Sequence, residues 1–262
     1  MIRIGFICPT YNAAVLHKYT EKSLVSFFDT TPNGVAIVVD DGSTSWSSEY
    51  ENKLKALANA SEIHFIHFPK NGGLTRSWNA GLTKAAHLKL THAIAGNNDV
   101  IFTPNWHAGM LHAAENNYSM IGPLSNAPGI TAKGKQEISR HYSGYKLTDE
   151  QEELEKVAKH VYDKNLGKII ESYVNGFFLF AKMSEWQRGM YDKQNYFRPV
   201  NLNMSNGKKN PTPLMTLNED ELQSRWAAKN MKSAICLSSF IFHYRAVSRG
   251  DKYKLGKWFR QT

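Results

Sequence analysis

The chain has 262 residues, of which 42% are hydrophobic and 12% aromatic, a composition that supports a substantial core and excludes a disordered chain. No apolar run approaches the ~20 residues of a membrane-spanning helix, and no secretory leader precedes the first polar motif, so we expect a cytoplasmic protein without a transmembrane segment. The net charge is +9, and residues 201–262 carry 11 Lys and Arg against 4 Asp and Glu. A basic segment of this kind favours an anionic partner, or else forms a solvated basic face.

The first hundred residues alternate between strand-like and helix-like segments. Short apolar runs predict strands at 2–8, 35–39, 63–68 and 91–95, and apolar residues on one face predict helices at 14–28, at 48–59 and from 74 onward. Such alternation is typical of parallel strands joined by crossover helices, whose ligands bind at the carboxyl ends of the strands. Three polar clusters, at 9–12, 40–44 and 97–99, follow predicted strands and are expected to converge there.

The second half of the chain is less regular. We predict a short helix near 106–114, strands at 173–181 and 233–244, and a helix at 218–230. Thr148 and Gln151 have the spacing of a capping box that opens an acidic helix ending near residue 162. The polar, Asn-rich stretch 201–213 predicts a loop of the kind that serves as a lid or an acceptor loop.

Several common catalytic motifs are absent from the sequence, among them G-x-G-x-x-G, the P-loop, C-x-x-C, H-E-x-x-H and G-x-S-x-G. A different set occurs in order: PTYN at 9–12, VVDDGST at 38–44, NGGLTRSWNAGL at 71–82, NND at 97–99, NGFFLF at 175–180, NEDELQSRW at 218–226 and FHY at 242–244. This ordered set resembles the family 2 glycosyltransferases of the GT-A fold, and the resemblance covers most of the chain.

The resemblance implies an α/β architecture, with a Rossmann-like, mostly parallel central sheet flanked by helices and a smaller mixed half on the acceptor side. It implies one domain over residues 1–262. Within it, residues 1–100 would form the nucleotide-binding half, 101–244 the donor-sugar and acceptor half, and 245–262 a basic C-terminal tail.

In this family the first strand's turn and the acidic strand end hold the nucleoside, usually uridine. Thr10 and Tyr11 would supply a hydroxyl and a stacking contact, and Asp40 would accept a hydrogen bond from the base. Asp41 would contact the ribose, or equally would only form the turn. The full set that the resemblance implies for the nucleotide sugar is Pro9, Thr10, Tyr11, Asn12, Asp40, Asp41, Asn71, Gly73, Arg76, Asn79, Asn97, Asn98 and Gly176.

Some members of this set have purely structural alternatives. Asn71 and Gly73 precede a helix N-terminus, where a ligand can approach the backbone closely. Arg76 could contact phosphate, and Asn79 could line the nucleotide or only support its helix. Gly176 would admit the donor sugar or form a β-bulge.

Residues 97–99 occupy the place of the family's D-x-D element, with Asn97 in the first acidic position. Asp99 would therefore be the carboxylate that binds a divalent ion, Mn²⁺ or Mg²⁺, beside the diphosphate. His243 aligns with a histidine that is a further metal or diphosphate ligand in many members, although a lone His on an apolar strand is more often a core residue. A nitrogen ligand would favour Mn²⁺.

The stretch 218–226 resembles the acidic helix start that carries the family's catalytic base. Depending on the alignment, Glu219 or Asp220 takes that position, and the sequence leaves the choice open. Acids in the first turn of this helix would also be stabilised by its dipole, so capping explains two of the three acids, Glu219, Asp220 and Glu221. Arg225 is expected to pair with one of them, and Trp226 to lie in the core.

These resemblances together predict a metal-dependent, inverting glycosyltransferase that uses a nucleotide-sugar donor. A UDP-sugar is the first donor to consider. A glycan is the first acceptor to consider. Modified DNA is the second, as in stand-alone phage members that glycosylate modified bases, and it would suit the basic charge after residue 200.

The other classes considered are a non-catalytic sugar-nucleotide binding domain and a nucleic-acid binding module. Asp99, His243 and the pair Glu219/Asp220 argue against both, because a binder needs no base. The sequence leaves the oligomeric state undetermined.

Overall fold

The computed structural model describes residues 1–11, 13–57, 62–129, 135–146, 148–199 and 215–244, with residues 13–17 and 215–219 described by their backbone alone. The strands are β1 (Ile4–Thr10), β2 (Val35–Asp40), β3 (Glu62–His67), β4 (His92–Gly96), β5 (Val100–Phe102), β6 (Met120–Leu124), β7 (Ile169–Glu171), β8 (Phe178–Lys182) and β9 (Ser233–His243). The helices are α1 (Ala13–Thr30), α2 (Ser48–Leu57), α3 (Leu74–His87), α4 (Trp106–Glu115), α5 (Gln151–Asn165), α6 (Met183–Arg188) and α7 (Met215–Ala228), with a 3-10 turn at Ile138–Arg140.

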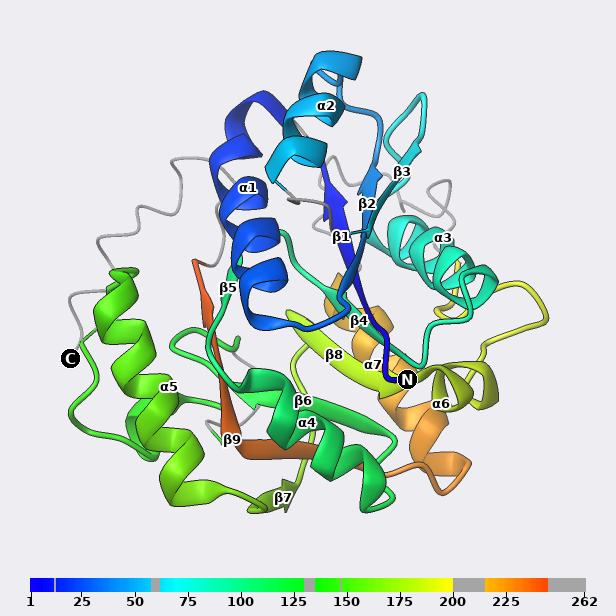
Figure 1. The fold of residues 1–262 in the computed structure, drawn as a ribbon. Coiled ribbons are helices and arrows are strands. Elements are labelled where there is room, and N and C mark those ends of the chain that lie inside the picture. The colour runs from blue at the N-terminus through cyan, green and yellow to red at the C-terminus, as the bar shows by residue number, and fades with distance from the viewer. Residues whose placement is uncertain (12, 58–61, 130–134, 147, 200–214, 245–262) are drawn as a thin grey trace, which may run out of the picture.

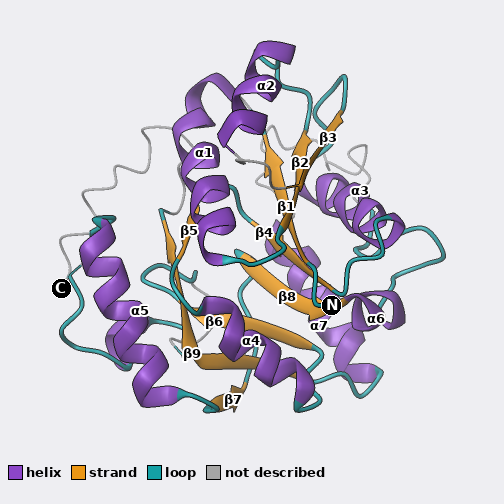
Figure 2. Cartoon of the chain, viewed as in Figure 1, coloured by secondary structure: helices purple, strands orange, loops and turns teal. Residues whose placement is uncertain are grey.

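One mixed sheet runs through the molecule in the order β3-β2-β1-β4-β8-β6-β9-β5, and β7 pairs with β9 (Figures 1 and 2). The first four strands of this order are mutually parallel, as the strand–helix alternation predicts. β8 then runs antiparallel to β4, and β5 runs antiparallel to the end of β9. The expected mostly parallel half and smaller mixed half are therefore both present.

Alternate residues of the central strands face two different helical layers. Phe6 and Cys8 of β1 pack with residues of α1, α2 and α4 on one face of the sheet. Ile7 packs with α3, α6 and α7 on the other face, together with Trp78 and Trp226. A third cluster joins α5 to residues along β9, from Ile235 to Phe242. This two-sided burial explains why the central strands are continuous apolar runs.

The predicted elements of the first half are confirmed to within a few residues, but three expectations for the second half are wrong. The strand expected at 173–181 begins only at Phe178, because the preceding backbone is held by side chains instead of by a neighbouring strand. Thr148 is not the cap of α5; Glu150 is, and the hydroxyl of Thr148 accepts a bond from the Glu150 N–H at 3.2 Å.

α7 begins at Met215, so its first turn holds no acid and the expected dipole role of residues 219–221 is wrong. Trp226 lies in the core and Arg225 pairs with Glu221 at 2.9 Å, both as expected. The predicted loop at 201–213 and the basic tail at 245–262 fall outside the described residues. No helix in the described part of the chain is both long enough and apolar enough to cross a membrane.

Candidate functional site

The carboxyl ends of β1 and β2 meet at a pair of buried polar side chains. Thr10 and Asp40 are register partners in the parallel ladder, and their residues are 3% and 0% exposed. Asp40 Oδ2 accepts a hydrogen bond from the Ser43 N–H at 3.0 Å and lies 2.7 Å from His67 Nδ1. Because a carboxylate only accepts, His67 donates from Nδ1.

The other polar atoms of this pair are unpaired. Asp40 Oδ1 and Thr10 Oγ1 are buried and have no hydrogen-bond partner among the described residues. Leaving a buried polar atom unpaired costs about 1–3 kcal/mol, so two such atoms at adjacent strand ends indicate a place where a ligand completes the bonding. A hydroxyl and a carboxylate oxygen suit a ligand that presents N–H or O–H groups.

Asp41, the neighbouring carboxylate, has a different set of partners. It accepts from the Gly72 N–H at 3.1 Å, from the Gly73 N–H at 2.7 Å and from Arg76 Nε at 3.2 Å. The Arg76 guanidinium also lies over the Phe68 ring, 4.0 Å from its centroid. Asp41 therefore fixes the turn that leads into α3. The two adjacent acids are accommodated because each has its own partners, His67 for Asp40 and Arg76 for Asp41.

Residues 97–99 follow β4 and meet the end of β9. His243 Nε2 lies 3.3 Å from Asp99 Oδ1 and 3.2 Å from Asn97 Nδ2. His243 and Asp99 are both buried. The Asn98 amide points elsewhere and donates to the Thr20 hydroxyl of α1 at 2.9 Å. The structure thus brings Asn97, Asp99 and His243 together, and it places Asn98 against α1.

The His243 ring is held on several sides. Its Nδ1 lies 2.8 Å from the Ala127 carbonyl, its backbone N–H donates to Asn126 Oδ1 at 2.8 Å, and its ring stacks on Phe177 at 4.9 Å between centroids. Neither Asn126 nor Ala127 could be assigned a role from the sequence. A sequence signal that could have found them is the short stretch 121–124, which ends at two polar residues, Ser125 and Asn126.

The donor chemistry of this cluster fits a divalent cation. Nδ1–H donates a hydrogen bond to the Ala127 carbonyl, which leaves the lone pair on Nε2. That lone pair faces the Asn97 amide and an Asp99 carboxylate oxygen, and a cation between Nε2 and the carboxylate would satisfy both. The described residues contain no group of three or more His, Cys, Asp and Glu side chains suited to a metal. Mg²⁺ and Mn²⁺ commonly take only one or two protein carboxylates beside phosphate oxygens, so this small donor set is compatible with them.

Phe177 connects this cluster to the segment that carries Gly176. The Phe177 carbonyl accepts from the Asn97 N–H at 2.9 Å, and Gly176, which precedes it, is buried. The backbone just before it is held by two glutamines. Gln136 Oε1 accepts from the Asn175 N–H at 2.7 Å, and Gln223 Oε1 accepts from the Val174 N–H at 2.9 Å. This turn is therefore tied to α7 as well as to the strand ends.

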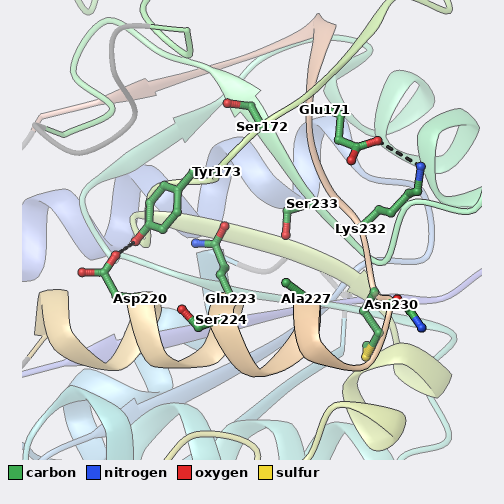
Figure 3. A pocket seen from close by; sticks show the side chains of 11 residues that line it. Glu171, Ser172, Tyr173, Asp220, Gln223, Ser224, Ala227, Asn230, Lys232 and Ser233 are labelled. Carbon is green, nitrogen blue, oxygen red and sulfur yellow. Dashed lines mark hydrogen bonds and ion pairs between the residues drawn. The ribbon is translucent and has the colours of Figure 1, made fainter.

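The acids of α7 differ in their surroundings. Asp220 Oδ1 accepts a hydrogen bond from the Tyr173 hydroxyl at 2.6 Å, and Asp220 is exposed (Figure 3). The Glu221 carboxylate is paired with Arg225, whose Nε donates to Glu221 Oε1 at 2.9 Å. The side chain of Glu219 falls outside the described part of the structure. Of the described acids here, Asp220 is the one that faces away from the core.

The remaining residues of the expected set are spread around these strand ends. Tyr11 is 43% exposed just after β1, Pro9 is buried opposite Val39, and Asn71 is exposed beside the turn into α3. Asn12 falls outside the described residues. Asn79 is buried, and its carboxamide holds the backbone of 196–197 with three bonds of 2.8–3.1 Å. We therefore assign Asn79 a structural role and leave it out of the proposed site.

The fold is an α/β architecture with polar side chains gathered at the carboxyl ends of its central strands, and a family match identifies its class. The chain belongs to the family described as Glycosyl transferase family 2, which matches residues 6–189, well over half of its length. The match ends before α7. No curated protein matches the chain.

Three solved structures share the GT-A fold with this chain at low sequence identity. GalNAc-T7 with UDP, GalNAc and Mn²⁺ aligns with a TM-score of 0.58 and 12% identity over 93% of this chain and 43% of its own. The Pyrobaculum calidifontis mannosyltransferase PcManGT, in complex with GDP-Man and Mn²⁺, has a TM-score of 0.55 and 11% identity over 92% and 56%. Residues 1–349 of S. aureus TarS have a TM-score of 0.53 and 15% identity over 98% and 64%. The chain thus spans between 43% and 64% of the length of these structures.

Proposed function

We propose that this chain is a metal-dependent, inverting glycosyltransferase that moves a sugar from a UDP-sugar to an acceptor hydroxyl. The observation that carries the donor site is the pair of buried atoms without partners, Thr10 Oγ1 and Asp40 Oδ1, beside the Asp99–His243 pair at the neighbouring strand ends. A uracil ring offers an N–H to the carboxylate, as thymine and guanine do too, so this observation supports a base with a ring N–H and the screen below separates the three. The nucleotide-bound structures of similar fold support a nucleotide-sugar donor in general.

Asp99 and His243 would hold a divalent ion, with Asn97 beside them. When bound, that ion would neutralise the charge that develops on the departing diphosphate. The protein's own part is to keep the His243 ring in one orientation through Ala127, Asn126 and Phe177, so that Nε2 always faces Asp99.

Asp220 or Glu219 would act as general base. The base takes the proton from the acceptor hydroxyl as that oxygen bonds to the anomeric carbon, while the bond from that carbon to the phosphate oxygen breaks on the opposite face. Inversion at the anomeric carbon follows from this single displacement. Tyr173 would orient Asp220 through the bond to Oδ1.

The test is a screen of UDP-, GDP- and dTDP-sugars for released nucleotide, with Mn²⁺ and with EDTA. We expect release from a UDP-sugar with Mn²⁺ and none with EDTA. We also expect Asp220→Asn or Glu219→Gln to lower kcat roughly 10²–10⁴-fold with little change in the Kd for UDP. The matched control is Glu152→Gln on the exposed face of α5. Full turnover in EDTA, or full activity in both acid variants, would contradict the proposal.

A further inference from the structure

α1 presents a row of hydroxyl groups to the end of the sheet. Thr20, Ser23 and Ser26 follow one another at three-residue intervals on this helix, beside the core residues Leu24 and Phe27. Thr20 and Ser23 are fully buried. A buried hydroxyl without a hydrogen bond destabilises the fold, so a row of this kind indicates that its members hold specific partners.

Two of these hydroxyls contact β5, which is the last strand in the order of the sheet (Figure 1). β5 pairs with β9 along one edge. Along the other edge, the Val100 N–H donates to Ser23 Oγ at 3.0 Å and the Phe102 N–H donates to Ser26 Oγ at 3.0 Å. α1 thus takes the place of a neighbouring strand and satisfies backbone donors that an open edge would leave to solvent.

Ser23 also holds the turn that carries Asp99. Its Oγ lies 2.8 Å from the Asn98 carbonyl oxygen and 2.6 Å from the Val100 carbonyl oxygen, so its one proton serves two acceptors. The Asn98 carbonyl belongs to the peptide plane that precedes the Asp99 Cα, and the Val100 N–H belongs to the plane that follows it. A single hydroxyl therefore bonds to both peptide planes that flank Asp99.

Holding these two planes fixes the direction of the Asp99 side chain. The orientations of two adjacent planes determine φ and ψ of the residue between them, and the Cα–Cβ bond follows from that geometry. The second plane is held again from β9, where the Asp99 carbonyl accepts from the Tyr244 N–H at 2.9 Å. The Asp99 carboxylate is in this way kept facing His243, with Oδ1 3.3 Å from Nε2.

Thr20 holds the same turn through a side chain. Its hydroxyl accepts from Asn98 Nδ2 at 2.9 Å, which ties the residue before Asp99 to α1 a second time. The strand contact of Ser26 is with Phe102, three residues beyond Asp99. The row therefore contains two hydroxyls that hold the turn and a third that holds the strand after it.

We propose that Ser23 is a positioning residue for divalent metal binding by Asp99, and that Thr20 supports it in this role. The inference rests on the proposed function for the identity of the ligand, which is Mn²⁺ beside a nucleoside diphosphate. Ser23 acts through Asp99, because it orders the carboxylate beside His243 before the ion arrives and so removes the cost of ordering the turn on binding. Loss of its hydroxyl should weaken the binding of Mn²⁺ more than that of the nucleotide.

Ser23→Ala and Ser26→Ala form a matched pair for the test. Each removes one hydroxyl from the same face of α1 and leaves one N–H of β5 without its acceptor. The Kd for Mn²⁺ is measured on the full chain with saturating UDP, from the electron paramagnetic resonance signal of free Mn²⁺. The Kd for UDP in EDTA is measured by calorimetry, and urea denaturation gives the free energy of unfolding of each variant.

We expect Ser23→Ala to raise the Kd for Mn²⁺ roughly 10- to 100-fold, the range typical of residues that orient a metal ligand. Ser26→Ala should keep a Kd for Mn²⁺ near the wild-type value, and both variants should keep the wild-type Kd for UDP in EDTA. A loss of stability alone would change Mn²⁺ binding to the same degree in both variants. Equal Kd values for Mn²⁺ in Ser23→Ala and Ser26→Ala would therefore overturn the inference.

Thr20→Val and Thr20→Ser keep the test decisive if Ser23→Ala fails to fold. Valine has the shape of threonine without its hydroxyl, whereas serine keeps the hydroxyl, so Thr20→Val should bind Mn²⁺ more weakly than Thr20→Ser. Equal binding by these two variants would then overturn the inference. Absence of Mn²⁺ binding in the wild type would overturn the proposed function and this inference with it, whereas wild-type binding with unchanged variants overturns this inference alone.

Discussion

At the scale of single residues, Asp40 shows how a carboxylate can be specified by its surroundings. One oxygen is committed to the Ser43 N–H and His67, and the other is buried without a partner among the described residues. His67 itself stacks on Trp46, with the ring planes 16° apart. The imidazole therefore holds Oδ2 of Asp40 and leaves Oδ1 as the oxygen available to a ligand.

Asp40→Asn should weaken the binding of UDP. The Ser43 N–H requires an oxygen, so the amide NH₂ would take the position of Oδ1 and present a donor where the ligand needs an acceptor. Loss of a charge-assisted hydrogen bond is worth about 1.5–3 kcal/mol, which corresponds to roughly a 10- to 150-fold rise in Kd. Isothermal titration calorimetry measures the Kd for UDP in the wild type and in the variant. Asp29→Asn, on the exposed face of α1, is the matched control, and equal Kd values in the two variants would contradict the assignment.

For single residues, the sequence indicated which residue types form the site, but it did not indicate which side chains or carbonyls contact them. The resemblance singled out Asp40, Asp99 and His243, and the structure brings the last two within 3.3 Å of each other. It could not show that His67 holds Asp40 or that Ala127 holds His243, because neither contact follows from a local pattern. Asn79 was included for its position in a motif, whereas its amide is occupied by the backbone of 196–197.

At the scale of elements, two loops at the strand ends require glycine for different reasons: Gly42 follows β2 and Gly73 precedes α3. Gly42 and Gly73 both have positive φ, at 84° and 89°. A Cβ at Gly42 would lie 2.4 Å from the Lys70 carbonyl carbon, whereas a Cβ at Gly73 would meet nothing within 4 Å. Gly42 is thus required by close packing of two loops. Gly73 is required only by its backbone conformation, and it leaves open space above the turn.

Gly42→Ala should destabilise the protein more than Gly73→Ala. Both variants pay about 1–2 kcal/mol for a left-handed alanine, and Gly42→Ala additionally forces apart two stretches of backbone, at a further cost of about 1–3 kcal/mol. Urea denaturation compares the two free energies of unfolding. The two variants serve as controls for each other, and equal losses would show that the contact with Lys70 can relax freely.

Helices and strands with a strong period were predictable, and their ends were not. The short apolar runs predicted the central strands correctly, and the helical periodicity predicted α1 and α3. α7 begins at Met215, upstream of the acids that marked its expected start. β6 and β7 were not predicted, because each is short and its register is set by long-range pairing with β9.

At the scale of the whole molecule, β9 explains why residues far apart in sequence form one site. It runs beside β6 from Ser233 and ends beside β5, where Val100 pairs with His243. This antiparallel pairing places the last described strand against the 97–99 turn. The Tyr244 N–H, just beyond, donates to the Asp99 carbonyl at 2.9 Å and closes the arrangement.

The buried His92 should make the stability of the whole protein depend on pH. Burial lowers the pKa of His92 from 6.5 to about 4, with a smaller contribution from Lys182. The unfolded chain therefore binds more protons between these two values, so the free energy of unfolding falls as pH falls from about 6.5 to 4. A shift of this size corresponds to roughly 3 kcal/mol.

His92→Phe should remove that part of the pH dependence while keeping a ring stacked on Phe180. We expect the wild type to lose about 2–3 kcal/mol more than the variant between about pH 7.5 and 4.5, as measured by urea denaturation at both values. The matched control is His87→Phe, whose histidine is exposed at the end of α3. Parallel losses in His92→Phe and the wild type would show that His92 is protonated in the folded state.

The sequence by itself determined the fold class, the family and the residue types at the strand ends, because periodicity and ordered motifs are local properties of the chain. The tertiary structure decided which of those residues meet. It separated Asp40 from Asp41 by giving them different partners, joined Asp99 to His243, and placed Asp220 beside Tyr173. Such contacts depend on long-range strand pairing and helix packing, which no short stretch of sequence records.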